Sequence, residues 1–193
     1  CIPYVPSGSS VSPVISDLLH LDGETATTNT HRPALGKTIT IEGTDYIWSD
    51  ARDDDGLWAD SSGVEYFVAY WAITVVSPSE RTVRLGYRHD NVLRVWRNGE
   101  LIIDTETMAR DNGTEAQSDP FTLLQGDNLF ILKGWEWRSS NWWGMRLLDE
   151  SGNDLSDLAY TFPSEGPAMV TVLSPNGGET AAVGDVLRVT WEA

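Results

Sequence analysis

Tryptophan is the residue type in this 193-residue chain that is best suited to binding a ligand, and four of the nine tryptophans stand in the segment WEWRSSNWW. A flat indole ring can pack its face against the C–H side of a sugar ring while its N–H reaches a polar partner. Trp135 and Trp137 are two residues apart, so on a strand both would point to one face. Together with Arg138 and Trp142 they predict a sugar-binding platform at a hairpin tip. The alternative is that these rings pack in the protein core.

Other tryptophans are expected inside the fold. Trp142 and Trp143 are adjacent, so on a strand they would point to opposite faces and one of them is expected in the core. Trp71 and Trp96 stand within apolar runs, and we assign both to the core.

Carboxylates crowd the segment SDARDDDGLWAD and offer the hard oxygen ligands that Ca²⁺ prefers. The predicted ligands are Asp50, Asp53, Asp55 and Asp60. Asp53-x-Asp55-Gly56 partly resembles the start of an EF-type loop, but no helical pattern flanks it and no Glu stands at the twelfth position. The alternative is an acidic, solvated turn. Ca²⁺ is therefore the one cofactor that the sequence suggests.

Catalytic motifs are missing from the sequence. It contains no G-x-S-x-G, no H-E-x-x-H and no phosphate-binding glycine loop. His20, His31 and His89 are expected in loops or turns, and no spacing identifies an acid/base pair of carboxylates. We therefore predict that the chain is not an enzyme.

The net charge and the single cysteine exclude several classes of partner and of structural site. The formal charge of −16 repels phosphate groups, which argues against nucleic acids and anionic membrane surfaces. The only cysteine is Cys1, which excludes an intramolecular disulfide and a Cys₄ or Cys₂His₂ zinc site. Cys1 and the Pro/Ser-rich residues after it are typical of a lipid-modified bacterial lipoprotein; a fragment start or an intermolecular disulfide are the alternatives. No apolar run of about 18 residues predicts a transmembrane helix.

The chain divides into three parts. Residues 1–14 predict an extended arm or linker, residues 15–163 one β-sandwich module, and residues 164–193 a linker followed by the first strands of a second domain. Val64 to Val76 predicts a central strand that is buried on both faces. Asn98-Gly99 predicts a type I′ hairpin turn.

Further strands are expected where polar and apolar residues alternate or where short apolar runs lie between turns. They are Lys37 to Glu42, Arg81 to Tyr87, Val92 to Arg97, Glu100 to Asp104, Phe121 to Leu124, Asn128 to Gly134 and Trp143 to Leu148. Because no long helical pattern occurs, the predicted fold class is all-β, an antiparallel β-sandwich or jelly roll.

Three motifs within residues 45–162 resemble the second half of galactose-binding-like and PA14-like β-sandwich modules. They are Val95-Trp96-Arg97-Asn98-Gly99, then Leu123 to Lys133 with Gly126 and Asn128, then Trp143-Gly144 followed by Asp149 and Gly152. The resemblance implies carbohydrate binding or adhesion. In PA14-like adhesins a paired Asp-Asp before the V-W strand holds calcium at the sugar site. This chain has Asp90-Asn91 there, so one carboxylate of that pair is missing.

The final residues, VTVLSPNGGETAAVGDVLRVTWEA, resemble the first strands of a bacterial Ig-like repeat. We therefore expect a non-catalytic carbohydrate-binding or adhesion module of a bacterial secreted or cell-surface protein, with a polysaccharide or glycan as partner. The alternative is a structural subunit or spacer of a surface array or filament. Its arm and its incomplete C-terminal piece would add strands to neighbouring copies.

Overall fold

The computed structural model describes residues 2–4, 33–41, 43–50, 67–89, 91–105, 115–136, 143–164, 171–174 and 190–192. Most of these residues form an antiparallel β-sandwich without helices, as predicted from the sequence, and residues 171–174 and 190–192 form a separate two-stranded sheet. The strands are β1 (Ile2–Tyr4), β2 (Thr38–Ile41), β3 (Thr44–Ile47), β4 (Phe67–Ser77), β5 (Arg81–His89), β6 (Val92–Arg97), β7 (Glu100–Asp104), β8 (Ala116–Gln117), β9 (Phe121–Leu123), β10 (Gly126–Glu136), β11 (Trp143–Leu148), β12 (Ala159–Thr161), β13 (Thr171–Ser174) and β14 (Thr190–Glu192). Within this part of the chain, no helix has the length and apolar character needed for a membrane crossing.

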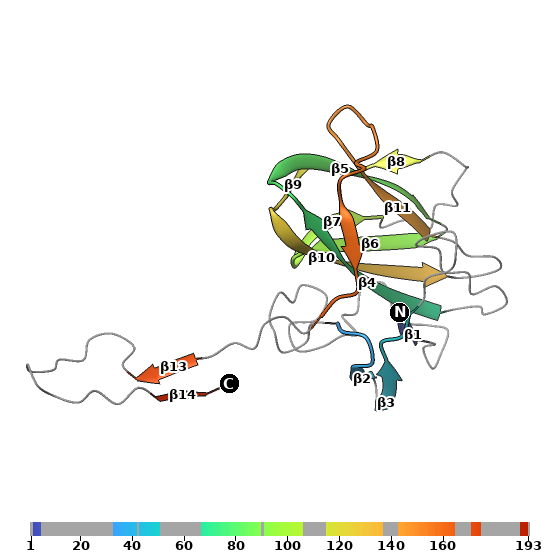
Figure 1. Cartoon of the computed structure of the whole chain (residues 1–193). Helices are drawn as coiled ribbons and strands as arrows, with labels where there is room; N and C mark the ends of the chain where they lie inside the picture. Colours follow the sequence, from blue (N-terminus) through green and yellow to red (C-terminus); the bar gives the residue numbers. More distant parts are fainter. Residues whose placement is uncertain are drawn as a thin grey trace, which may run out of the picture.

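The larger sheet has the strand order β1-β4-β10-β6-β7, and β12 also pairs with β4 (Figure 1). β4 lies against β10 along its whole length, from Phe67 opposite Glu136 to Ser77 opposite Gly126. Its residues 68–70 are buried on both faces of the sheet. The prediction of a central strand buried on both faces is confirmed for these three residues, whereas Trp71 to Ile73 are only partly buried.

The smaller sheet has the order β11-β5-β8, with β9 also pairing with β5 (Figure 1). Its inward side chains meet those of the larger sheet in the main core. This core includes Val75 of β4, Leu85 of β5, Val95 of β6, Phe130 of β10 and Trp143 of β11. Burial of these apolar side chains away from water is the dominant contribution to the stability of such a sandwich.

A second core covers the outer face of the larger sheet. The β2–β3 hairpin supplies Ile39 and Ile41, which pack in the same cluster as Tyr70 and Trp96. Trp96 is thus buried, as predicted, but on the face away from the smaller sheet. Lys133 is also buried on this face, with its Nζ 5.5 Å from the centre of the Tyr70 ring. An aromatic face stabilises a buried cation at this distance.

The structure differs from the predictions at several short elements. β1, β8 and β12 have only two or three residues each and were not predicted, because period-2 alternation cannot be detected over so few positions. β1 lies within the segment predicted as an arm. His89 was predicted in a loop or turn, and this was wrong: β5 continues through His89, which pairs with Trp143 of β11.

Candidate ligand-binding end of the sandwich

Strand register brings four connecting segments to one end of the sandwich. Glu136 lies opposite Phe67, Trp143 opposite His89, and Asp104 opposite Arg94. The connections 90–91, 106–114 and 137–142, and the segment that enters β4, therefore join strand ends at this end. It is on the right of the sandwich in Figure 1. We call it the loop end.

The loop end unites two predicted clusters that are distant in the sequence. The connection 137–142 belongs to the predicted tryptophan platform, and the connection 90–91 holds the predicted Asp90-Asn91 turn. The platform residues Trp137, Arg138 and Trp142, the predicted turn residue Asp90 and the predicted calcium ligands Asp53, Asp55 and Asp60 all lie outside the described residues. The register thus brings together the strand ends that flank these segments.

Three predicted site residues are described. Trp135, near the end of β10, is partly buried and packs against the outer core, so much of its ring is used in packing. Asn91 is buried and has a φ of 64°, a left-handed conformation that asparagine tolerates better than most residues. Asp50 is exposed and follows β3. No group of three His, Cys, Asp or Glu side chains suited to a metal occurs among the described residues.

A pair of tryptophans lies inside the sandwich near the loop end. Trp143 is 2% exposed, and its Nε1 donates a hydrogen bond to the Val92 carbonyl at 3.2 Å. Its ring centre is 5.0 Å from that of Trp71, with the two planes at 47°. Trp143 is therefore the member of the 142–143 pair that is in the core. Trp71 is only partly buried, although its Nε1 is buried and has no hydrogen-bond partner among the described residues.

The close fit of Trp143 depends on Gly134 of β10. A Cβ at this position would lie 2.6 Å from Cε2 of the Trp143 ring and 2.9 Å from two further ring atoms. Real Cβ atoms do not approach this closely, so any larger residue at position 134 would push the ring away. Gly134 thus lets an indole from the smaller sheet rest directly on the backbone of the larger sheet.

Tyr87 and His89 were missed as site residues in the sequence. They are two residues apart on β5, and their rings stack with centres 5.9 Å apart and planes at 22°. His89 Nδ1 lies 3.2 Å from the Asn91 carbonyl oxygen. Because a carbonyl only accepts, this bond places a proton on Nδ1. Burial raises the pKa of Tyr87, so its hydroxyl stays protonated near neutral pH and can donate a hydrogen bond. The signal available in the sequence was their period-2 spacing immediately before Asp90.

The opposite end of the sandwich holds the β6–β7 turn and the turn between β9 and β10, together with the longer connection from Asp149 to Leu158. Asn98 and Gly99 both have positive φ, 49° and 84°, which confirms the predicted type I′ turn between β6 and β7. The Asn98 side-chain oxygen accepts from the Leu129 N–H at 2.8 Å. Asn128 is 0% exposed; its amide donates to the Leu124 carbonyl at 2.8 Å and its oxygen accepts from the Leu124 N–H at 3.0 Å. We call Asn98 and Asn128 with these bonds the asparagine cluster.

The residues that carry the family resemblance therefore have structural roles here. Asn98 and Asn128 hold the two turns together, and Trp143 and Lys133 are buried. Asp149 Oδ1 accepts from the backbone N–H groups of Ser151 and Asn153 and so closes the turn after β11. These residues are therefore not counted among the candidate site residues.

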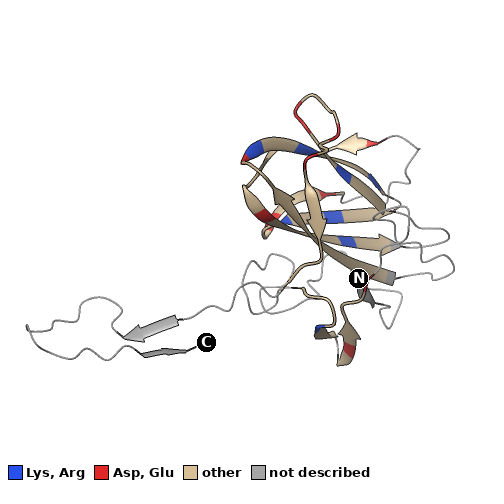
Figure 2. Ribbon diagram, in the orientation of Figure 1, with Lys and Arg blue, Asp and Glu red and all other residues tan. Residues whose placement is uncertain are grey.

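Figure 2 shows where the positively and negatively charged residues lie along the strands, and several of the arginines form ion pairs with carboxylates. The pairs are Arg81–Asp157, Arg94–Asp104, Arg97–Glu100, Arg146–Glu115 and Arg146–Asp154. Glu115, and to a lesser extent Asp154, raise the pKa of Arg146. In each pair a carboxylate neutralises the arginine charge, so these paired arginines form no cationic patch for an anionic ligand.

No protein-family model, no curated protein and no solved structure matches this chain. The assignment of a function therefore depends on the residues and their arrangement.

Proposed function

We propose that this chain is a non-catalytic carbohydrate-binding module of a bacterial extracellular or cell-surface protein, similar to galactose-binding-like and PA14-like sandwiches. The observation that carries the proposal is the convergence at the loop end. The connection bearing Trp137 and Trp142 and the connection bearing Asp90 leave the sandwich beside Tyr87 and His89.

The chemistry of this end suits a neutral sugar. Aromatic rings provide flat apolar surfaces, and a protonated tyrosine hydroxyl and an imidazole provide hydrogen bonds to sugar hydroxyls. The formal charge of −16 repels anionic glycans, so neutral or cationic polysaccharides are favoured. The missing second carboxylate at Asp90-Asn91 favours a sugar held without bridging calcium at that turn.

Calcium remains part of the proposal at a different place, the acidic segment that contains Asp53, Asp55 and Asp60. A calorimetric titration of the chelator-treated protein with Ca²⁺ tests it. Heat of binding that disappears in the variant Asp53→Asn/Asp55→Asn supports a calcium site, and an absence of binding heat in the unmodified protein contradicts it.

The sugar site is tested by screening the full chain against soluble glycans and insoluble polysaccharides, followed by calorimetry with the best ligand. Trp137→Ala and Trp142→Ala should each weaken binding by about fivefold or more, the value of one stacking contact of about 1 kcal/mol. Tyr160→Ala is the matched control, because Tyr160 is an aromatic residue on β12 that is 49% exposed. Its register partner is Val75, far from the loop end.

Near-UV circular dichroism of each variant establishes that the Trp71–Trp143 pair is intact. Absence of binding to any glycan would contradict the proposal. So would unchanged affinity in both tryptophan variants, or an equal loss in Tyr160→Ala.

A further inference from the structure

The peptide bond between Asp119 and Pro120 lies between β8 and β9, the two short strands that pair with one edge of β5 (Figure 1). Of the nine prolines in the chain, Pro120 is the only one that follows an aspartate. An aspartyl–prolyl bond is cleaved more readily in mild acid than other peptide bonds, because the side-chain carboxyl can attack its own carbonyl carbon and the protonated proline nitrogen leaves easily. The surroundings of the bond decide whether the fold promotes this reaction.

Asp119 and Pro120 belong to a bulge in the edge of the smaller sheet. Residues 86 and 87 of β5 pair with β8, and residues 81–83 pair with β9. The two remaining residues of β5, 84 and 85, face the three residues 118–120, so the outer strand carries one extra residue. Such bulges redirect side chains and are common near functional sites. Both residues of the bond are exposed, so water has access to it.

Ser118 polarises the carbonyl group of the Asp119–Pro120 bond. Its hydroxyl donates a hydrogen bond to the Asp119 carbonyl oxygen at 2.7 Å, because a carbonyl oxygen can only accept. The same Oγ accepts from the Leu85 N–H at 2.9 Å, and Ser118 is 6% exposed. The hydroxyl hydrogen therefore points at the oxygen that becomes negatively charged when the carbonyl carbon is attacked. A fixed donor at this position stabilises the transition state.

The Asp119 carboxyl group is available as the nucleophile. In the part of the chain that the structure describes, no hydrogen bond or ion pair holds this side chain. Arg84 Nη1 donates to the Ser118 carbonyl oxygen at 2.8 Å, and the Ser118 N–H donates to the Leu85 carbonyl at 2.9 Å. These bonds fix the backbone just before Asp119. The nucleophile and the polarised carbonyl belong to one residue, so only rotation of the Asp119 side chain is needed to bring them together.

We propose that the Asp119–Pro120 bond is a self-cleavage site at which the Ser118 hydroxyl assists the reaction. An oxygen of the Asp119 carboxyl group bonds to the Asp119 carbonyl carbon and forms a cyclic anhydride, while the carbon–nitrogen bond to Pro120 breaks. The proton of the carboxyl group moves to the proline nitrogen. Water then opens the anhydride, so one fragment ends at Asp119 and the other begins at Pro120. Each chain reacts once, without turnover, and water is the only co-reactant.

The two fragments remain joined by strand pairing. Residues 1–119 contain β4, β5 and β6, whereas residues 120–193 contain β9, β10, β11 and β12. β10 lies between β4 and β6, and both β9 and β11 pair with β5. Cleavage therefore converts the module into two chains that share one fold and separate on denaturation. The site lies beside the middle of β5 and is independent of the proposed sugar binding at the loop end.

The test compares the full chain with the blocked peptide acetyl-Gln-Ser-Asp-Pro-Phe-amide, in which nothing positions the serine hydroxyl. Both are kept at about pH 5.5 and 37 °C, and mass spectrometry follows cleavage. We expect the folded chain to be cleaved roughly tenfold faster than the peptide, less than the hundredfold or more that a fully enclosed oxyanion donor supplies. The cleaved protein should give one peak in gel filtration and two bands on a denaturing gel.

Substitutions at the site separate the two roles. Ser118→Ala should slow cleavage to the rate of the peptide, whereas Ser118→Thr keeps the hydroxyl and should retain most of the acceleration. Asp119→Glu should also slow cleavage, because its carboxyl must close a larger ring. Ser79→Ala, an exposed serine in the β4–β5 turn, is the matched control and should leave the rate unchanged.

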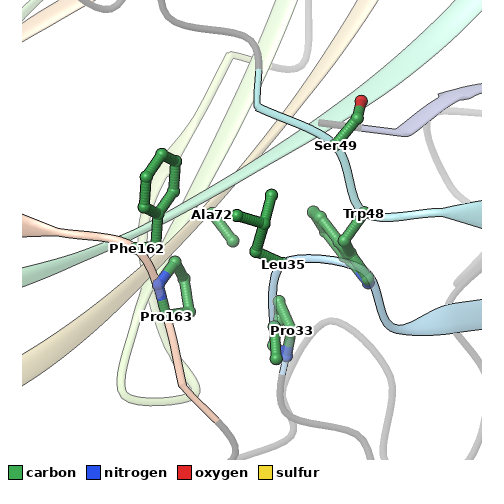
Figure 3. A pocket seen from close by; sticks show the side chains of 8 residues that line it. Pro33, Leu35, Trp48, Ser49, Ala72, Phe162 and Pro163 are labelled. Atoms are coloured by element: carbon green, nitrogen blue, oxygen red, sulfur yellow. The ribbon is translucent and has the colours of Figure 1, made fainter.

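Leu35→Ala is a second control, for a general loosening of the fold. Leu35 is 54% exposed and lines an apolar hollow together with Trp48 and Phe162 (Figure 3). Trp48 belongs to the outer core on the larger sheet, whereas β8 and β9 belong to the smaller sheet. This variant should therefore be cleaved at the rate of the unmodified chain.

Methoxyamine distinguishes the anhydride route from hydrolysis by a contaminating protease. It should capture part of the fragment ending at Asp119 as a methoxyamide, which a protease would not produce. A folded chain that is cleaved no faster than the peptide would overturn the proposal. So would an unchanged rate in Ser118→Ala, or fragments that form without any methoxyamide. If Ser118→Ala is unfolded by circular dichroism, the peptide comparison and the methoxyamine experiment on the unmodified chain decide.

Discussion

Replacing Gly134 by alanine tests whether β10 must lack a side chain at the position that contacts Trp143. The added Cβ would lie 2.6 Å from Cε2 and 2.9 Å from Cδ2 and Cζ2 of the indole. None of these atoms is the end of a flexible chain, since the ring is 2% exposed, hydrogen-bonded to Val92 and packed on Trp71. The ring or the strand must therefore shift.

Two opposing effects decide the sign of this substitution. Glycine to alanine at an unstrained position stabilises a protein by about 0.4–1 kcal/mol, because it restricts the unfolded chain. Forcing an extra carbon into a packed core costs about 1–3 kcal/mol. The clash is the larger effect, and we expect the free energy of unfolding to fall by about 1–2 kcal/mol. In a chain of this size, that change lowers Tm by about 2–8 °C.

Urea denaturation followed by tryptophan fluorescence measures this free energy, and near-UV circular dichroism reports the Trp71–Trp143 arrangement. The same substitution made in a Trp143→Phe background completes a double-mutant cycle. Because the smaller ring leaves room for the Cβ, the two changes should be coupled by about 1 kcal/mol or more. An unchanged or increased free energy of unfolding for Gly134→Ala, or additive effects in the cycle, would refute the packing argument.

Three further predictions concern the turns. Asn128→Ala should lower the free energy of unfolding by about 1–3 kcal/mol, because it removes the hydrogen bonds between a fully buried side chain and the partly buried backbone groups of Leu124. The exposed control Gln125→Ala should change it by less than about 0.5 kcal/mol, and similar losses in both would contradict the role of the asparagine cluster. Gly99→Ala should cost about 1 kcal/mol by the same measurement, since φ is 84° there, and no loss would argue against a type I′ turn. The hydrogen bonds from Asn153 lower the pKa of Asp149. The ionised Asp149 carboxylate therefore stabilises the fold fully above the unfolded pKa of about 3.9, and this stabilisation disappears as the pH falls through the lower folded pKa. An NMR titration should show a higher Asp149 pKa in Asn153→Ala, and an unchanged value would exclude this cause.

The strands that could be predicted from the sequence are those whose own residues alternate or form long apolar runs. β6, β7 and β11 have the predicted bounds, and β4 lies within three residues of its predicted bounds at both ends. Pairing could not be predicted, because β10 lies between β4 and β6, far from both in the chain. Trp71 was predicted to be buried from its apolar neighbours. It is only partly buried, although it packs against Trp143 in the main core.

The sequence predicted two parts of the candidate site but not that they lie at the same end of the sandwich. The tryptophan segment and the Asp90-Asn91 turn were recognised separately by residue type, but only the register of β10, β11 and β5 shows that they leave the same end of the sandwich. His89 was missed because the predicted strand ended at Tyr87, which left His89 in the following turn. Its stacking on Tyr87 follows from β5 continuing two residues further than the alternation indicated.

The asparagine cluster has a consequence for how such a module can diversify. Its hydrogen bonds join β6, β9 and β10 at the end away from the loop end, and none of them involves residues 106–114 or 137–142. Insertions and substitutions in those connections therefore leave the frame's closing bonds untouched. A library randomised only in residues 137–142 should consequently yield mostly folded proteins, so this connection can vary in sequence without loss of the sandwich.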